Sequence, residues 1–121
     1  MNVKTFLVAL ALTTPSLTFA HEADKGPNGG RLIEASGYHV ELVPKTGVVE
    51  VFITDKNEKP VAASGYTGTA ILLIAGKQQR VVLAPSGSDR LTGTIIGAVP
   101  TSPKGVVQLF APTGNISAHF K

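Results

Sequence analysis

The sequence contains no cysteine and no tryptophan. Without thiols the chain can form no disulfide bond, no thiolate metal site and no cysteine-based catalytic centre. A small domain without disulfides must be held together by its apolar core alone. Aromatic residues make up 6% of the chain, and most of them are needed in that core, so a stacking platform for sugars or nucleobases is not expected.

Charge is sparse as well. The chain carries 11 basic and 8 acidic residues, a net charge of +3, and its basic residues never form a run. A nucleic-acid-binding surface needs clustered Lys and Arg, usually with aromatic side chains beside them. We therefore expect no nucleic acid partner.

Residues 1–20 have the three parts of a secretory signal. Lys4 supplies the positive charge, residues 6–12 form an apolar run, and Thr18-Phe19-Ala20 supplies the small residues before a cleavage site. The apolar run is shorter than the ~20 residues that a membrane-spanning helix needs. We predict export to the periplasm with cleavage after Ala20, giving a mature chain that begins at His21 and is not inserted in the membrane.

Two further parts follow the signal: a polar, glycine-rich arm at 21–30, predicted to be flexible, and one domain at 31–121. In the domain, short apolar runs alternate with turns rich in Gly, Pro, Asn and Ser, and no window has a convincing helical period. We expect strands at 31–35, 38–43, 48–54, 67–75, 78–84, 90–96, 105–111 and 115–120. This spacing predicts an all-β fold, a single antiparallel, immunoglobulin-like β-sandwich of about seven to eight short strands.

The first predicted hairpin, formed by 38–43 and 48–54, brings ionisable residues together. A four-residue loop keeps the apolar rows of both strands on one face, and it places Glu41 opposite Glu50 and His39 opposite Phe52 on the outer face. Two opposed carboxylates repel each other. A divalent cation, with His39 as a further ligand, would relieve the repulsion, and so would a nearby lysine. The third interpretation is a simple solvent-exposed face of the sheet.

The chain has three histidines. His21, at the predicted new terminus, offers an α-amine and an imidazole, and Glu22 could add an oxygen; nitrogen donors of this kind suit Cu(II), Ni(II) and Zn(II). His119 is expected on the outer face of the last strand, and its distance from His39 depends on the strand order. The candidate metal ligands are His21, Glu22, His39, Glu41, Glu50 and His119.

No catalytic constellation is visible in the sequence. The serines lie in turns or on alternating strands without a nucleophile-elbow motif, and the aspartates lie in turns where they bond to their own backbone. The glycine-rich run at 26–30 is no phosphate loop, because no helix and no Lys-Ser/Thr follow it. We therefore expect a protein that is not an enzyme.

The segment GPNGGRLIE at 26–34, followed by YHVEL at 38–42, resembles the start of a small β domain in periplasmic adaptor proteins of heavy-metal efflux pumps of the resistance-nodulation-division type. The likeness continues in the segments 51–55 and 59–61 and later in Leu91-Thr92-Gly93. The family often has His where this chain has Asn28, which weakens any metal site carried over to the arm. The resemblance implies a periplasmic β-sandwich that works near metal homeostasis.

Two functions follow from these observations. One is an exported, non-enzymatic module of heavy-metal homeostasis or efflux, which binds Cu, Zn or Ni weakly or docks on periplasmic efflux components. The alternative is a structural or protein-interaction β-sandwich with no ligand.

Overall fold

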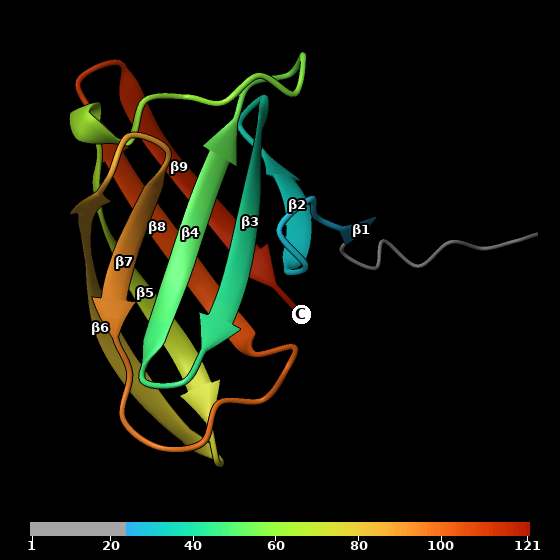
Figure 1. Ribbon diagram of the computed structural model, residues 1–121, viewed down its shortest axis with the longest axis vertical. Helices are drawn as coiled ribbons and strands as arrows, with labels where there is room; N and C mark the ends of the chain where they lie inside the picture. Colours follow the sequence, from blue (N-terminus) through green and yellow to red (C-terminus); the bar gives the residue numbers. More distant parts are fainter. Residues whose placement is uncertain (1–23) are drawn as a thin grey trace, which may run out of the picture.

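The computed structural model describes residues 24–121, which form nine β-strands and one short 3-10 helix (Figure 1). The elements are β1 (Asp24–Lys25), β2 (Arg31–Ala35), β3 (Tyr38–Lys45), β4 (Val48–Thr54), η1 (Ala63–Gly65), β5 (Thr67–Ile74), β6 (Lys77–Ser86), β7 (Arg90–Thr94), β8 (Lys104–Ala111) and β9 (Gly114–Phe120). The predicted signal peptide at 1–20 and the predicted ligands His21 and Glu22 lie outside the described residues. Within residues 24–121, no helix has the length and hydrophobicity needed to span a bilayer.

Every predicted strand is present, with ends that differ from the prediction by at most two residues. Apolar and polar residues alternate along them, and glycines in the left-handed region, such as Gly47 (φ 75°) and Gly76 (φ 78°), turn the chain between neighbours. All strand pairs are antiparallel, so the all-β, antiparallel prediction is confirmed. The two-residue β1 had no predicted counterpart.

Hydrogen bonding runs without a break through the order β1-β2-β3-β4-β7-β6-β5-β8-β9. The long strand β6 makes this continuity possible, because residues 77–83 pair with β5 and residues 84–86 pair with β7. Figure 1 shows β3, β4 and β7 in front of β5, β8 and β9. The sheet is thus folded over on itself like a nearly closed barrel, and the strand order does not confirm an immunoglobulin-like sandwich.

Arg31 joins the two ends of the folded sheet. From the start of β2 its guanidinium donates Nη1–H to the Pro103 carbonyl (3.3 Å) and Nη2–H to the Lys121 carbonyl (2.6 Å). The same group lies 5.8 Å from the centroid of the Phe120 ring on β9. This contact holds β2 against β9, the pair of strands between which the barrel lacks ladder hydrogen bonds.

The core fills the space between the two layers. Its fully buried members come from both layers and are large aliphatic residues for the most part: Val40, Leu42, Val49, Val51, Leu72, Leu83, Leu91, Val107 and Leu109. Burial of this kind is the main stabilising contribution available to a chain without disulfides.

The register of the β3–β4 hairpin differs from the prediction. The turn has two residues, Thr46 and Gly47, because Pro44 and Lys45 continue β3. Glu41 therefore lies opposite Phe52, Val43 opposite Glu50 and His39 opposite Thr54. The predicted pairing of Glu41 with Glu50 and of His39 with Phe52 is wrong. The shift is two residues, an even number, so each side chain stays on its predicted face.

Candidate functional site

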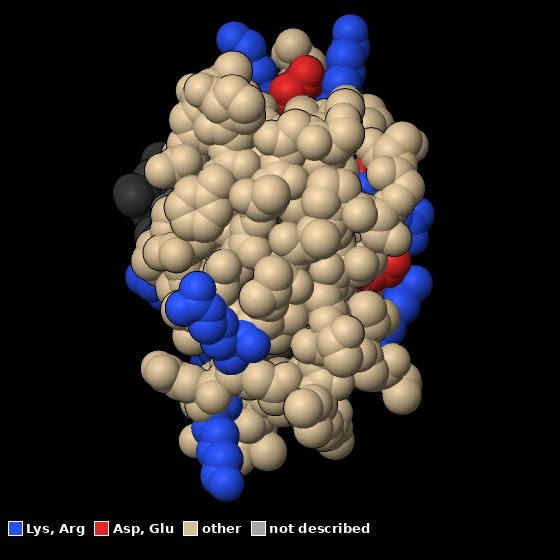
Figure 2. Space-filling model, turned by 90° about the vertical axis from the view of Figure 1, so that its left-hand side faces the viewer, with Lys and Arg blue, Asp and Glu red and all other residues tan. Residues whose placement is uncertain are grey.

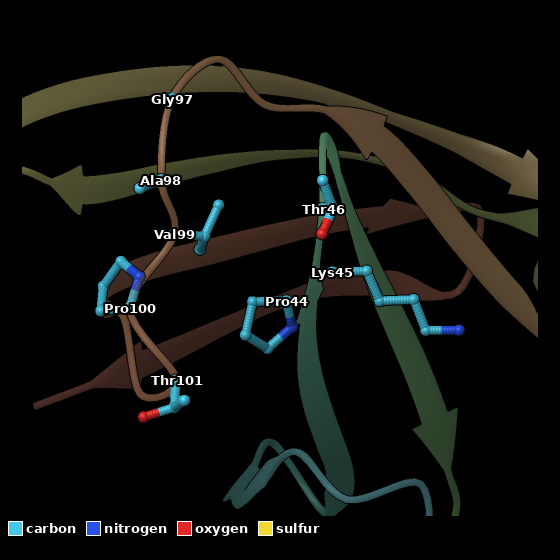
Figure 3. Close-up of a pocket in the computed structure, with 8 residues that line it drawn as sticks. All are labelled: Pro44, Lys45, Thr46, Gly97, Ala98, Val99, Pro100 and Thr101. Atoms are coloured by element: carbon cyan, nitrogen blue, oxygen red, sulfur yellow. The ribbon is translucent and has the colours of Figure 1, made fainter.

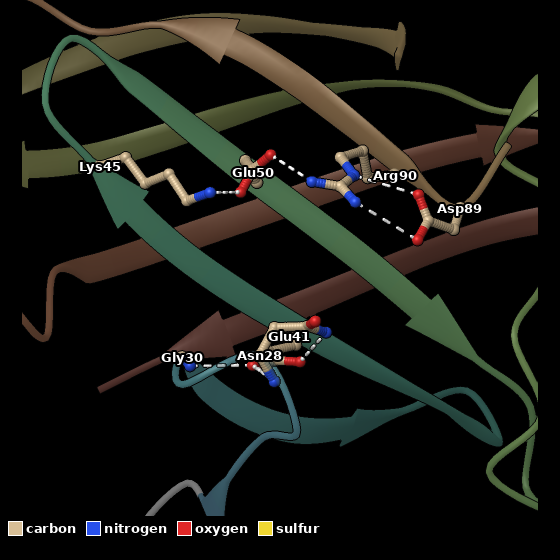
Figure 4. Close-up of polar contacts among 7 residues, drawn as sticks. All are labelled: Asn28, Gly30, Glu41, Lys45, Glu50, Asp89 and Arg90. Atoms are coloured by element: carbon tan, nitrogen blue, oxygen red, sulfur yellow. Dashed lines mark hydrogen bonds and ion pairs between the residues drawn. The ribbon is translucent and has the colours of Figure 1, made fainter. Parts of the chain in front are cut away.

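The carboxylate of Glu41 is bound by the glycine-rich segment 26–30 (Figure 4). Oε2 accepts the backbone N–H of Asn28 (2.9 Å) and of Gly30 (2.8 Å), and Oε1 accepts Nδ2–H of Asn28 (2.9 Å). Glu41 is 1% exposed. A buried carboxylate needs hydrogen-bond donors of this kind, and here the protein itself supplies three of them.

The glycines of this segment are required by its close approach to β3. A Cβ atom added at Gly26 would overlap the Glu41 side chain, and one added at Gly30 would overlap the Leu42 carbonyl. Gly29 has φ 83°, in the left-handed region, and open space around it. The run GPNGG is therefore shaped to cover Glu41. The contacts of this segment do not measure its motion, so the flexibility predicted for 21–30 stays a prediction.

Glu50 is the second buried carboxylate, and two basic side chains neutralise it (Figure 4). Its oxygens lie 2.7 Å from Lys45 Nζ and 2.8 Å from Arg90 Nη1. Hydrogen bonds from Lys45 and then Arg90 lower the pKa of Glu50, against the opposing effect of burial. A nearby lysine was one of the interpretations drawn from the sequence, and Lys45 is such a lysine for Glu50, although Glu50 does not lie opposite Glu41.

Arg90 connects Glu50 to two further groups. Its Nε–H donates to Asp89 Oδ1 (3.0 Å), and its guanidinium lies 4.8 Å from the centroid of the Phe52 ring. These hydrogen bonds hold the pKa of Arg90 above its ordinary value and that of Asp89 below its own. The arm and this ionic cluster cover the outer face of β3 and β4, so the predicted solvent-exposed face is wrong.

His39 takes part in a loop contact. Its Nδ1 lies 3.3 Å from the carbonyl oxygen of Asp55, at the start of the loop after β4. The Asp55 carboxylate accepts the backbone N–H groups of Asn57 (2.8 Å) and Lys59 (3.0 Å), and the bond from Lys59 is the main cause of its lowered pKa. Asp55 thus caps its own turn, as the sequence indicates.

His119 lies on the outer side of β9, opposite Val106 of β8. Across residues 24–121 no group of three or more His, Asp or Glu side chains is placed to hold a metal ion. His39, Glu41 and Glu50 each have partners within the fold, whereas His21 and Glu22 lie outside the described residues. Metal binding by the predicted ligands stays a prediction.

A hollow of about 440 Å³ lies between the β3–β4 turn and the loop at 97–101 (Figure 3). Lys45 is its one charged lining residue, and that side chain is paired with Glu50. Another hollow, of about 130 Å³, is lined by Tyr38 and Tyr66 among others, and burial is the main cause of the raised pKa of Tyr66. Neither hollow brings a nucleophile together with a general base.

The outer side of β5, β6, β8 and β9 carries no carboxylate. Register and burial place the following side chains there: Thr67, Thr69, Ile71, Leu73, Gln78, Arg80, Val82, Ala84, Lys104, Val106, Gln108, Phe110, Asn115, Ser117 and His119. We call this surface the acid-free face. It includes large apolar residues that solvent reaches, with Val82 71%, Leu73 44% and Phe110 42% exposed.

The acid-free face reflects an uneven distribution of charge along the chain. Between Lys59 and Lys121 the one acidic residue is Asp89, which lies in the β6–β7 turn. Figure 2 views the molecule from the side of β6 and β7: the centre is uncharged, and acidic groups are confined to the upper and right margins. The face could not be predicted from the sequence alone, because it depends on the strand order that brings β6, β5, β8 and β9 together.

Comparison of the chain with models of known protein families, with curated proteins and with solved structures finds no match.

Proposed function

We propose that this protein is an exported, non-enzymatic docking module of heavy-metal homeostasis, which binds its partner through the acid-free face. The observation that carries the docking proposal is the exposure of Val82, Leu73 and Phe110 on one sheet surface that has no carboxylate. Exposed apolar side chains gathered on one face are characteristic of interaction sites.

The carboxylates elsewhere in the fold support the same proposal. Glu41 is occupied by the arm, and Glu50 is occupied by Lys45 and Arg90. Both groups stabilise the fold in their present contacts, and both are shielded from solvent. The acid-free face, in contrast, presents side chains whose apolar surface has no partner within the described residues.

The link to metal homeostasis comes from the likeness of the segments 26–34 and 38–42 to the efflux adaptors. The structure adds a physical reason for that pattern, because Asn28 and Gly30 bind Glu41 across the two segments. These contacts explain the pattern by its role in stabilising the fold. A link to metal homeostasis must therefore be tested separately. Periplasmic components of metal efflux are the partners that the likeness favours.

Site-specific photocrosslinking in exporting cells tests the docking proposal. A photoreactive residue replaces Val82, an apolar residue of the acid-free face that is 71% exposed, or Glu34, an exposed residue on β2 that serves as the control. We expect an adduct of defined mass from position 82, with either a protein or a lipid, and none from position 34. Equal labelling at both positions, or none at position 82, would contradict docking through this face.

The second candidate function is transition-metal binding at the processed terminus. Cleavage after Ala20 would leave His21 with its α-amine and imidazole free, beside Glu22, and a chelate of that kind suits Cu(II), Ni(II) and Zn(II). This terminus would lie only a few residues before β1, which begins at Asp24.

Calorimetric titration with Cu(II) and Zn(II) tests this candidate. The protein is recovered after export, with cleavage verified by mass, and is compared with a form that carries one additional Ala before His21. Binding that is lost in the extended form would support the terminal chelate. Equal binding in both forms would direct attention to His39 and His119, and no binding would reject the metal function.

A further inference from the structure

We infer that the acid-free face binds the anionic headgroups of a lipid membrane surface, with the basic end of the face making the main contact. This inference rests on the proposed docking function and names the partner. It describes a protein that lies on the membrane surface without spanning it.

The register places basic and apolar side chains side by side at one end of the face. Ile71 on β5 lies between Arg80 on β6 and Val106 on β8, and the next outward residue, Leu73, lies opposite Lys104. Lys77 lies at the same end of β6, but it pairs with the buried Ile74 and so is in register with the inner side of the sheet, outside the acid-free face. Figure 2, which views the side of β6 and β7, shows Lys and Arg side chains at both the lower and the upper end, with an uncharged centre between them.

These basic groups are available for a ligand. None of the ion pairs among the described residues includes Arg80 or Lys104, whereas Lys45 and Arg90 are both bound to Glu50. No carboxylate on the face repels a phosphate group. Basic residues near an anionic leaflet gain free energy that adds up over several groups, and adjacent apolar side chains add to it by entering the interfacial layer.

The composition of the face favours a lipid surface over a protein partner. Residues that dominate protein–protein affinity are Trp, Tyr and Arg, and of these the face has Arg80 alone. Protein interfaces also pair charges of both signs. The face has charges of one sign, aliphatic side chains, and Thr and Gln that can form hydrogen bonds. Such a surface is more complementary to a layer of phosphate headgroups than to a protein interface.

The test is co-sedimentation with vesicles made of equal parts of phosphatidylglycerol and phosphatidylcholine, compared with vesicles of phosphatidylcholine alone. The protein is recovered after export, and its mass is measured. We expect binding to the anionic vesicles and little to the neutral ones. The double variant Arg80→Gln/Lys104→Gln should bind about 25-fold more weakly, since each basic group accounts for about a fivefold change in partition.

Lys56→Gln/Lys59→Gln is the matched control, because it removes the same charge from the exposed loop after β4. It should weaken binding less than twofold, and Leu73→Glu should abolish binding by placing a carboxylate at the basic end. Melting temperatures of all variants establish that they are folded.

Three results would overturn the inference: no preference for anionic vesicles, equal losses in the two double variants, or a protein adduct at position 82 without vesicle binding. The last of these would leave the docking function standing with a protein as its partner. Absence of both vesicle binding and crosslinking would reject the docking function as well.

Discussion

Glu41 binds Asn28, thirteen residues earlier in the chain, through both of its carboxylate oxygens. One oxygen accepts the Asn28 backbone N–H and the other accepts the side-chain amide, each at 2.9 Å. This two-point contact fixes the segment before β2 onto β3, and it explains why an acidic residue is tolerated at a position that is 1% exposed.

Replacing Glu41 tests the contribution of this contact to stability. Glu41→Ala should lower the free energy of unfolding by about 3 kcal/mol, because it leaves buried donors of Asn28 and Gly30 without an acceptor. Glu41→Gln should cost much less, since an amide oxygen can still accept the two backbone N–H groups. Urea denaturation measures both variants, and equal losses would contradict the contact as described.

Two glycines of the arm should respond differently to alanine. Gly26→Ala should cost about 2 kcal/mol or more, because the added methyl overlaps the Glu41 side chain. Gly29→Ala should cost about 1 kcal/mol, the penalty of a left-handed conformation in open space. Thermal unfolding of the two variants side by side checks the order, and a larger effect at Gly29 would show that the arm packs differently.

Glu50 should make stability depend on pH in the acid range. Its pKa in the folded state is lowered by Lys45 and Arg90, so its contribution is fully present above the unfolded value of about 4.3 and is lost as the pH falls through the folded value. Asp55 and Asp89 titrate in the same direction, so the contribution of Glu50 must be isolated by substitution.

The comparison is between the unaltered protein and Glu50→Gln, with unfolding free energies measured from neutral pH downward. The variant should be about 1 kcal/mol less stable at neutral pH, and the two curves should converge in acid. Glu34→Gln, on the exposed side of β2, is the control and should run parallel to the unaltered protein. Parallel curves for Glu50→Gln as well would contradict this role.

Arg31 should control the closure of the barrel. Arg31→Gln removes the hydrogen bonds to the carbonyls of Pro103 and Lys121, and we expect a loss of about 1 kcal/mol in unfolding free energy. Amide hydrogen exchange should rise on β9 more than on β4. Arg80→Gln, whose guanidinium makes no ion pair in the described region, should change neither measurement, and faster exchange throughout would argue against a local role.

Strand positions were predictable from the sequence because each strand has its own alternating pattern and is bounded by turn residues. The β3–β4 register was not, because a two-residue and a four-residue loop both keep the apolar rows of the two strands on one face. In the structure Pro44 lies inside β3 opposite Val49. A single two-residue change in loop length then altered every cross-strand neighbour of Glu41, His39 and Glu50.

The site was predictable only in part, for a related reason. Alternation places Glu41 and Glu50 on the outer side of their strands, but their burial depends on what covers that side. Glu41 is covered by Asn28 and its neighbours, and Glu50 by Arg90 from a strand forty residues later in the chain. Long-range contacts of this kind follow from strand order, which local patterns do not contain.

The strand order also has a kinetic consequence. β4 pairs with β7 across the separation from Val48 to Thr94, and β5 pairs with β8 across that from Thr67 to Phe110. Such distant pairings form slowly, because the entropy cost of closing a large loop comes before the contacts add any stability. A chain that uses the predicted signal at 1–20 would therefore remain unfolded for longer after synthesis, which keeps it competent for passage through a narrow translocation channel.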